Sequence, residues 1–311
     1  MSLLGEIVLL KTADERAPDI EALETLRRRP GIDARTARSI DDEIWSIRLG
    51  AKTEVDAAYQ LEFDFKDSRH WAVIHDLRLE IDGQVAQIDH LVISRMLEVF
   101  VCESKSFTGG VKVNEQGEWT TFRDRRPIGI PSPIEQNRRH IAVLEQAIKL
   151  GFIDLPRRIV AIKPRFVNIV LVSERGSIGR PRKKAPELDA IVKVDQFRSH
   201  LLKRDFSSLS LLKVVGSGTL EGFGRQLVAL HQPAARDWAK RFGIGEPSRV
   251  PTDAVEPLAA PASNAVCARC GVVVSIAEAR FCRFNKARFD GQIYCMPCQQ
   301  IVAPHRPATS A

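Results

Sequence analysis

The chain of 311 residues has few of the features that place a protein in a membrane or outside the cell. It contains no apolar run of 18 residues, so we expect no transmembrane helix and no membrane partner. Its first residues, Met1 to Lys11, lack a basic stretch and include Glu6, which argues against a secretory signal. We therefore expect a cytoplasmic protein.

Cysteines are also scarce, and they are unevenly placed. The chain has six, of which five lie within residues 267–298. In a protein expected in the cytoplasm, such clustering favours a metal site over disulfide bonds. Cys102 lies apart from this cluster and is interpreted as a core residue.

What the chain does contain fits a globular protein with a polyanionic partner. Hydrophobic residues make up 44% and charged residues 27%, and the net charge is +7. The net charge favours nucleic acid, although basic clusters are also a common form of solvated surface. No aromatic-rich strand accompanies the clusters, which lie at residues 123–126, 138–139, 157–158 and 180–184.

Hydrophobic spacing predicts an α/β fold with one mixed central sheet flanked by helices. Helices are expected at residues 18–29, 52–65, 133–150, 195–202, 219–230 and 234–242. Strands are expected at residues 71–79, 85–94, 97–104, 111–113, 119–122, 166–172 and 190–194. Asp82-Gly83 predicts a hairpin turn, and Ser132, Pro133 and Glu135 predict a capped helix start with Gly151 at its end.

Composition divides the chain into four parts. A helical extension at residues 1–50 precedes a larger domain at 51–242. Residues 243–266 are rich in proline, alanine and serine with little periodicity, which predicts a flexible linker. The cysteine-rich module follows at residues 267–300.

Two apolar segments of the second part carry charged side chains. Asp89 lies in the first, and in the second, period-2 alternation puts Glu103 and Lys105 on one face of a strand. Two carboxylates and a lysine at the ends of adjacent strands can hold a divalent cation and activate a water for phosphodiester hydrolysis. An isolated pattern of this kind is more often an ion pair at a strand end. Here the apolar surroundings disfavour unpaired charges, which strengthens the functional interpretation.

The order of the motifs resembles the nuclease-related domain, NERD, of the PD-(D/E)xK superfamily. The resemblance covers roughly residues 50–150 and rests on Glu54 on a helix, Gln87-Ile88-Asp89, Glu103-Ser104-Lys105, Gly109 and the segment Pro131 to Asn137. It implies a restriction-endonuclease-like core in which the strands carry the Asp and the Glu-x-Lys pair. The middle residue of that pair is Ser104, where the family more often has Thr, Val or Ile. Ser104 is expected on the other face of the sheet, so this departure should not disturb the site.

Carried over residue by residue, the resemblance implies five catalytic positions. Asp89 and Glu103 would be direct ligands of Mg²⁺ or Mn²⁺, and Glu54 would bind through water or a second metal. Lys105 would orient the water or offset charge on the phosphate, and Gln136 would position a phosphate or Lys105.

Two neighbouring features receive structural interpretations. His90 should point to the opposite face from Asp89, where a core histidine is expected. Gly109-Gly110 could let the backbone approach a phosphate, but a plain turn is the preferred interpretation.

The C-terminal cysteines form two C-x₂-C pairs, Cys267/Cys270 and Cys295/Cys298. Four thiolates suit a structural zinc ion in a small zinc ribbon or treble-clef-like module. Cys282 is either a buried thiol or an alternative ligand, and His305 is expected to be free. The aromatic residues Phe281, Phe284 and Phe289 could stack on nucleic acid or simply fill the module's core.

The sequence therefore predicts a metal-dependent nuclease-like protein that acts on DNA, with a zinc module that aids binding. The alternative is a non-catalytic nucleic-acid-binding or protein-interaction module that retains the fold. Nucleases of this superfamily often cut two strands as dimers, so a homodimer is also open.

Overall fold

The computed structural model divides the chain into two compact units, residues 1–245 and 246–311. It describes residues 8–66, 68–107, 109–157, 161–182, 186–203, 214–244, 265–274 and 276–301. The predicted linker at 243–266 lies almost entirely outside these ranges, as does His305. No helix among the described residues combines the length and apolar character that crossing a membrane requires.

A mixed six-stranded sheet forms the centre of the first unit. The mixed central sheet was predicted, but its edge strand β1 was not, since residues 1–50 were expected to be a helical extension. The strand order is β1-β2-β3-β4-β8-β10, in which β3 is antiparallel to its neighbours β2 and β4 and the remaining neighbours are parallel. The strands are β1 Val8–Lys11, β2 Trp71–Ile81, β3 Gln84–Ser94, β4 Glu98–Lys105, β8 Arg165–Val172 and β10 Ile191–Lys193. Asp82 and Gly83 both have positive φ, which is the turn geometry that suits the predicted β2–β3 hairpin.

A smaller sheet follows β4, in the order β7-β6-β5-β9. Its strands are β5 Val111–Val113, β6 Trp119–Arg123, β7 Arg126–Ile130 and β9 Ile178–Gly179. The sequence did not predict β7, because Pro127 and Gly129 are poor strand residues, but at the edge of a sheet both are tolerated.

Gly109 and Gly110 allow the chain before β5 to lie close to Phe122 and Ser177. A Cβ atom at Gly109 would lie 2.3 Å from the backbone oxygen of Phe122, and one at Gly110 would lie 2.0 Å from Ser177 Oγ. The glycine pair therefore serves chain packing, and no approach of a phosphate is needed to explain it.

Six helices of the first unit have described bounds. They are α1 Ala17–Arg27, α2 Ala34–Phe65, α3 Pro133–Lys149, α4 Phe197–Leu202, α6 Ser217–Ala229 and α7 Trp238–Arg241. Short 3-10 turns lie at Pro186–Ala190 and Val194–Gln196. The expected helix at 52–65 is only the second half of α2, which runs unbroken across the expected boundary between residues 50 and 51.

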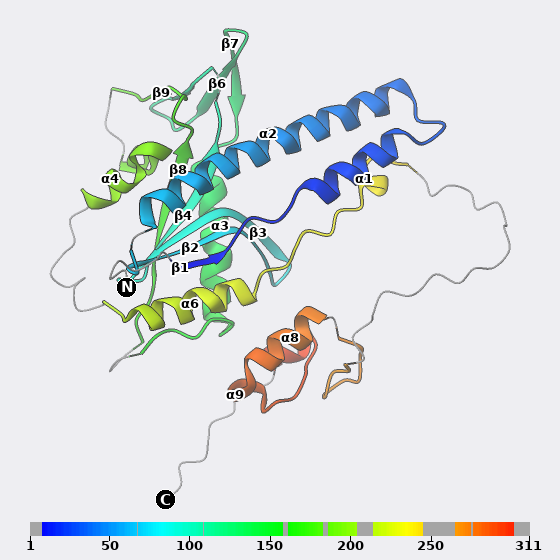
Figure 1. The fold of residues 1–311 in the computed structure, drawn as a ribbon, viewed down its shortest axis with the longest axis vertical. Coiled ribbons are helices and arrows are strands. Elements are labelled where there is room, and N and C mark those ends of the chain that lie inside the picture. The colour runs from blue at the N-terminus through cyan, green and yellow to red at the C-terminus, as the bar shows by residue number, and fades with distance from the viewer. Residues whose placement is uncertain are drawn as a thin grey trace, which may run out of the picture. The chain divides into compact units, whose positions relative to one another are not determined.

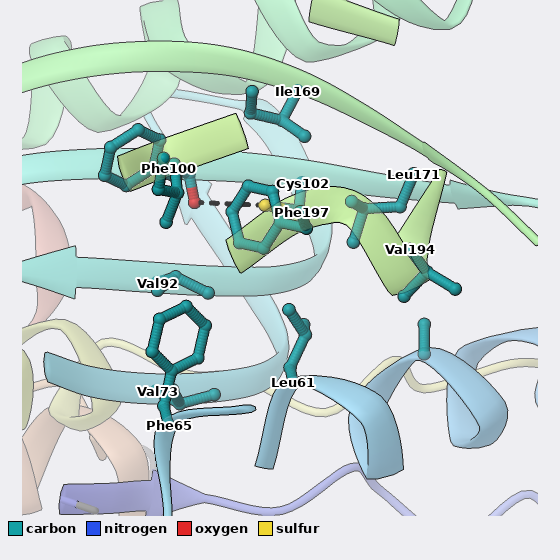
Figure 2. Close-up of a cluster of buried hydrophobic side chains, with 12 residues drawn as sticks. Leu61, Phe65, Val73, Val92, Phe100, Cys102, Ile169, Leu171, Val194 and Phe197 are labelled. Atoms are coloured by element: carbon teal, nitrogen blue, oxygen red, sulfur yellow. Dashed lines mark hydrogen bonds between the residues drawn. The ribbon is translucent and has the colours of Figure 1, made fainter. Parts of the chain in front are cut away.

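Helices α2 and α3 cover opposite faces of the central sheet (Figure 1). Ala57, Leu61 and Phe65 of α2 pack with strand residues such as Phe100 and Ile169 in one buried cluster (Figure 2). On the other face, Ile134 of α3 packs with Val170 and Val172. The Ser132 hydroxyl accepts a hydrogen bond from Glu135 N at 3.3 Å, and Gly151 has a φ of +75°, as the predicted helix start and end require.

The structure describes residues 265–274 and 276–301 of the second unit. An antiparallel bridge joins Val266 and Val273, and three helices follow at α8 Ile276–Phe284, α9 Lys286–Phe289 and α10 Met296–Ile301. The first cysteine pair lies within the bridged turn, where Gly271 has a φ of +72°, and the second pair spans the start of α10. One cysteine pair therefore lies on a turn and the other at a helix start.

Candidate functional site

Three acidic residues lie in a row across β2, β3 and β4. The register pairs His75 with His90 and Leu77 with Ile88, which places Asp76 opposite Asp89. It also pairs His90 with Cys102, which places Asp89 beside Glu103 on β4. Like charges on directly opposed residues destabilise a sheet, so this row needs compensating groups.

Glu103 is buried, with only 2% of its surface exposed, and lies beside Lys105 on the same face of β4. The Lys105 ammonium donates to Glu103 Oε1 at 2.6 Å, while Oε2 is buried without a hydrogen-bond partner. Burial raises the pKa of Glu103, and this effect outweighs the opposing contributions of Lys105 and Gln136. The Oε2 atom of Glu103 is therefore buried without a hydrogen bond of good geometry, in a carboxylate that the Gln136 side chain also approaches.

Asp89 is half-buried, and its Oδ2 accepts a hydrogen bond from the backbone N of Ser104 at 2.7 Å. Burial, followed by the charges of Glu103 and Glu54, raises the pKa of Asp89 well above its usual value. The three predicted carboxylates thus affect one another electrostatically, as a shared site requires.

Glu54 reaches this region from α2 and is held by an arginine that the sequence did not indicate. Arg16 Nη2 lies 3.1 Å from Glu54 Oε2 and 3.0 Å from Asp76 Oδ2. Burial alone would lower the pKa of Arg16, but the charges of Asp76 and Glu54 raise it. Arg16 therefore neutralises the end of the acidic row opposite Lys105.

Asp76 is the second residue that the sequence interpretation missed. It is buried, has a φ of +51° and accepts hydrogen bonds from Asp14 N and from the Gln87 side chain. A carboxylate inside an apolar strand was a visible signal, but no spacing rule tied Asp76 to Asp89. Arg16 gave no signal at all, because its role depends on the path of the chain before α1.

Gln136 enters the site from the first turn of α3, and its neighbour Asn137 fixes that helix on the sheet. Asn137 is fully buried, and its Nδ2 lies 3.0 Å from Val101 O and 2.8 Å from Ile169 O. These contacts tie α3 to β4 and β8 and hold Gln136 close to Glu103.

His90 lies on the opposite face of the sheet, as expected, within a buried polar chain. Its Nδ1 lies 2.7 Å from Nδ1 of His75, and its Nε2 lies 2.8 Å from Ser104 Oγ. Burial lowers the pKa of His75 to about 4 and that of His90 well below its usual value. Both rings are therefore neutral at pH 7, and neither faces the acidic row. Ser104 also turns its side chain away from that row, as expected.

The predicted carboxylates do not gather their oxygen atoms into one tight cluster in this structure. A metal site brings several potential ligand atoms close together. Among the described residues, one group of at least three such atoms has all of them within 4.8 Å of one another, and all its members are cysteines. Lys105 and Arg16 hold Glu103 and Glu54 instead. The donor set of Asp89 and Glu103 suits Mg²⁺, and the unpaired Oε2 of Glu103 is the atom that most needs such a partner.

The four C-terminal sulfur atoms belong to Cys267, Cys270, Cys295 and Cys298. Tetrahedral zinc with Zn–S bonds of about 2.3 Å would separate its sulfur ligands by roughly 3.8 Å, which this cluster can meet. Burial would raise the pKa of Cys267, but backbone hydrogen bonds of Cys295, Cys270 and Arg269 lower it to about 6. Burial and the neighbouring sulfur atoms instead raise the pKa of Cys298 to about 12, so a metal that binds all four sulfurs would have to displace protons. The cluster could therefore hold one zinc ion.

Cys282 lies outside that cluster, which resolves the alternative left open by the sequence. Its buried sulfur accepts hydrogen bonds from Tyr294 N at 3.2 Å and Gln299 Nε2 at 3.3 Å. Phe281 and Phe289 are also buried, so they fill the core of the module. The Phe284 side chain lies outside the described residues.

Comparison with known proteins bears on residues 49–169 of the first unit. Residues 49–169 match the family described as nuclease-related domain, NERD. An uncharacterized protein of Bacillus anthracis is 32% identical over 85 residues, which cover 27% of this chain and 40% of that protein. No solved structure matches the chain. The matched range contains Glu54, Asp89, Glu103, Lys105 and Gln136. Residues 49–169 of this chain therefore form a nuclease-related domain of the NERD family.

Proposed function

We propose that this domain hydrolyses phosphodiester bonds in DNA with the help of Mg²⁺ or Mn²⁺. The observation that carries the proposal is the pair of adjacent carboxylates, Asp89 and Glu103, with a buried oxygen that lacks a partner and with Lys105 alongside. A carboxylate pair of raised pKa is costly in a purely structural role.

Each residue has a role that its position supports. Asp89 and Glu103 would hold the cation. When bound, the cation would lower the pKa of the attacking water and polarise the phosphate. Lys105 would move from Glu103 toward the phosphate and offset its developing charge. Glu54, restrained by Arg16, would bind a water in the outer shell of the site, and Gln136 would orient a phosphate oxygen without titrating.

The test is cleavage of single-stranded, double-stranded and branched DNA with and without Mg²⁺ or Mn²⁺. D89N and K105M should each reduce cleavage by roughly 100-fold or more, as expected for the loss of a catalytic group. E98Q is the matched control, because Glu98 is also a buried carboxylate on β4 but pairs with Arg165 at the other end of the strand. E98Q should retain activity.

Absence of cleavage on all three substrates by the folded wild-type protein would refute the hydrolytic proposal. Equal activity of the wild type and D89N would refute the assigned roles and leave a contaminating nuclease as the explanation.

A second candidate function is nucleic-acid binding without cleavage. It is favoured by the ion pairs Lys105–Glu103 and Arg16–Glu54, which satisfy carboxylates that a metal would otherwise need. Such a module would bind DNA with strong salt dependence, and D89N would leave the affinity unchanged or increase it. Filter binding at several salt concentrations distinguishes this candidate, and salt-independent binding would refute it.

The cysteine module would recruit DNA or a protein partner in either case. A four-thiolate zinc site keeps its ligands best in a reducing compartment, which supports a cytoplasmic location.

A further inference from the structure

Helix α2 exposes an unusual set of large apolar side chains. Trp45 is 61% exposed, Tyr59 71% and Phe63 53%, and Leu49 is exposed at 40%. Single exposed apolar residues are ordinary, but a row of them along one helix indicates an interaction surface.

These residues follow the spacing of a helix–helix seam. Trp45, Leu49, Lys52, Asp56, Tyr59 and Phe63 are separated by alternating steps of four and three residues, the pattern that keeps one face toward a partner helix. We call these six residues the α2 seam. Glu54 follows Trp45 by nine residues, about two and a half helical turns, so it lies on the opposite face of α2. A partner on the seam would leave the acidic row accessible.

The α2 seam is complementary to itself when two copies run antiparallel about residue 54. That alignment places Trp45 against the partner's Phe63 and Leu49 against the partner's Tyr59. It also places Lys52 against the partner's Asp56, and just beyond the seam it brings Asp42 opposite the partner's Lys66. Every apolar residue meets an apolar residue and every charge meets its opposite. A parallel alignment would instead oppose Lys52 to Lys52 and Asp56 to Asp56.

We propose that α2 is a homodimer interface in which a second copy of this chain packs antiparallel along the seam. Lys52 and Asp56 already form an exposed i,i+4 ion pair at 2.9 Å, and two such pairs would alternate in charge around the two-fold axis. Lys66 Nζ lies 4.5 Å from the Phe63 ring centroid, which places a cation beside the terminal aromatic. Aromatic anchors flanking a central charge pair are a common composition for a stable interface.

The charge pattern of the α2 seam identifies the partner as a second copy of this chain. A different protein could cover the apolar residues of the seam, but binding to it would not require the seam to be complementary to itself. An isologous two-fold contact is the arrangement that requires this self-complementarity. The proposal does not depend on nuclease activity, because no seam residue belongs to the acidic row.

The test is the oligomeric state of the full chain, measured by sedimentation equilibrium up to about 100 μM, a range that resolves dissociation constants in the micromolar region. The wild type should form dimers. K52E places a carboxylate against the partner's Asp56 twice and should raise the dissociation constant by about tenfold or more. The double variant K52E/D56K restores opposite charges at both positions and should return the constant to near the wild-type value.

Two further variants separate this contact from general surface effects. Y59K should abolish dimers, because a lysine replaces the most exposed aromatic of the seam. I128E is the control, since Ile128 is an exposed apolar residue on β7 and lies outside the seam. Circular dichroism of each variant checks that its helices are intact.

A wild-type chain that stays monomeric over the whole range would overturn the proposal. A dimer unaffected by both Y59K and K52E would also overturn it, as would failure of K52E/D56K to restore what K52E loses.

Discussion

Asp89 and Glu103 lie side by side on antiparallel strands, and the burial of Asp89, followed by the charge of Glu103 beside it, sets how the site responds to pH. Because the pKa of Asp89 is raised in the folded chain, the folded state keeps a proton at pH values where the unfolded state has lost it. Stability therefore falls as pH rises from the ordinary Asp pKa toward the raised value. The carboxylate costs free energy at neutral pH unless a cation binds.

In Mg²⁺-free buffer at neutral pH, we expect D89N to raise the melting temperature by about 2 °C or more, which corresponds to roughly 1 kcal/mol for a unit of this size. The gain should vanish at low pH, where both folded and unfolded states of the wild type are protonated. Calorimetry at several pH values measures this difference, with the exposed Glu115→Gln as control. A lower melting temperature for D89N at neutral pH would contradict the electrostatic argument.

At the scale of residues, the sequence identified the charged side chains that are typical of a metal-dependent nuclease site. Asp89, Glu103 and Lys105 stood out because charges interrupt apolar strands at period-2 spacing. Asp76 and Arg16 did not, because their relation to the row depends on the β2–β3 register and on the path between β1 and α1.

At the scale of elements, the position of α3 on the sheet determines where Gln136 lies. Asn137 makes that attachment through the backbone oxygens of β4 and β8. We expect N137A to destabilise the chain by about 1–3 kcal/mol, because it removes buried hydrogen bonds between α3 and the backbone of β4 and β8. Urea unfolding measures the change, and Glu145→Ala on the exposed side of α3 is the control. A cost below that of the control would show that α3 is held by apolar packing alone.

The junction between the two sheets offers a second test at this scale. We expect G109A to cost about 1–3 kcal/mol, because its methyl group would collide with the Phe122 backbone. G129A is the matched control in the same small sheet, since a Cβ at Gly129 meets nothing within 4 Å. Comparable thermal unfolding of the two variants would mean that the junction can relax.

The periodic elements were predictable because their signals are local. The helix of residues 133–149, the Asp82-Gly83 turn and the central strands follow from caps, turn residues and alternation. The edge strand β7 was not predictable, since Pro127 and Gly129 disfavour a strand and only a neighbour in the sheet makes one.

At the scale of the whole molecule, the two units should respond separately to metal removal. The four sulfur atoms lie in the second unit, and the acidic row lies in the first. We expect one zinc per chain by elemental analysis. C298S should abolish zinc binding and unfold the second unit, because structural zinc supplies much of the folding free energy of so small a module.

C282S is the matched control for that experiment, because Cys282 is a buried thiol of the same unit outside the cluster. It should retain one zinc. Zinc loss in C282S equal to that in C298S would assign Cys282 to the metal site. Cooperative loss of the first unit's structure with either variant would show that the two units are coupled.

The sequence by itself determined the local chemistry of this protein: which strands carry carboxylates, which helices are capped, and which cysteines share a metal-binding spacing. These features depend on neighbours within about one helical turn or one strand, so composition and period reveal them. Tertiary structure alone decided that Asp76, Asp89 and Glu103 form one row, that Arg16 closes its end, that Cys282 stays outside the sulfur cluster, and that one face of α2 remains uncovered. Each of these depends on register or packing between segments far apart in the chain, and no local spacing rule encodes them.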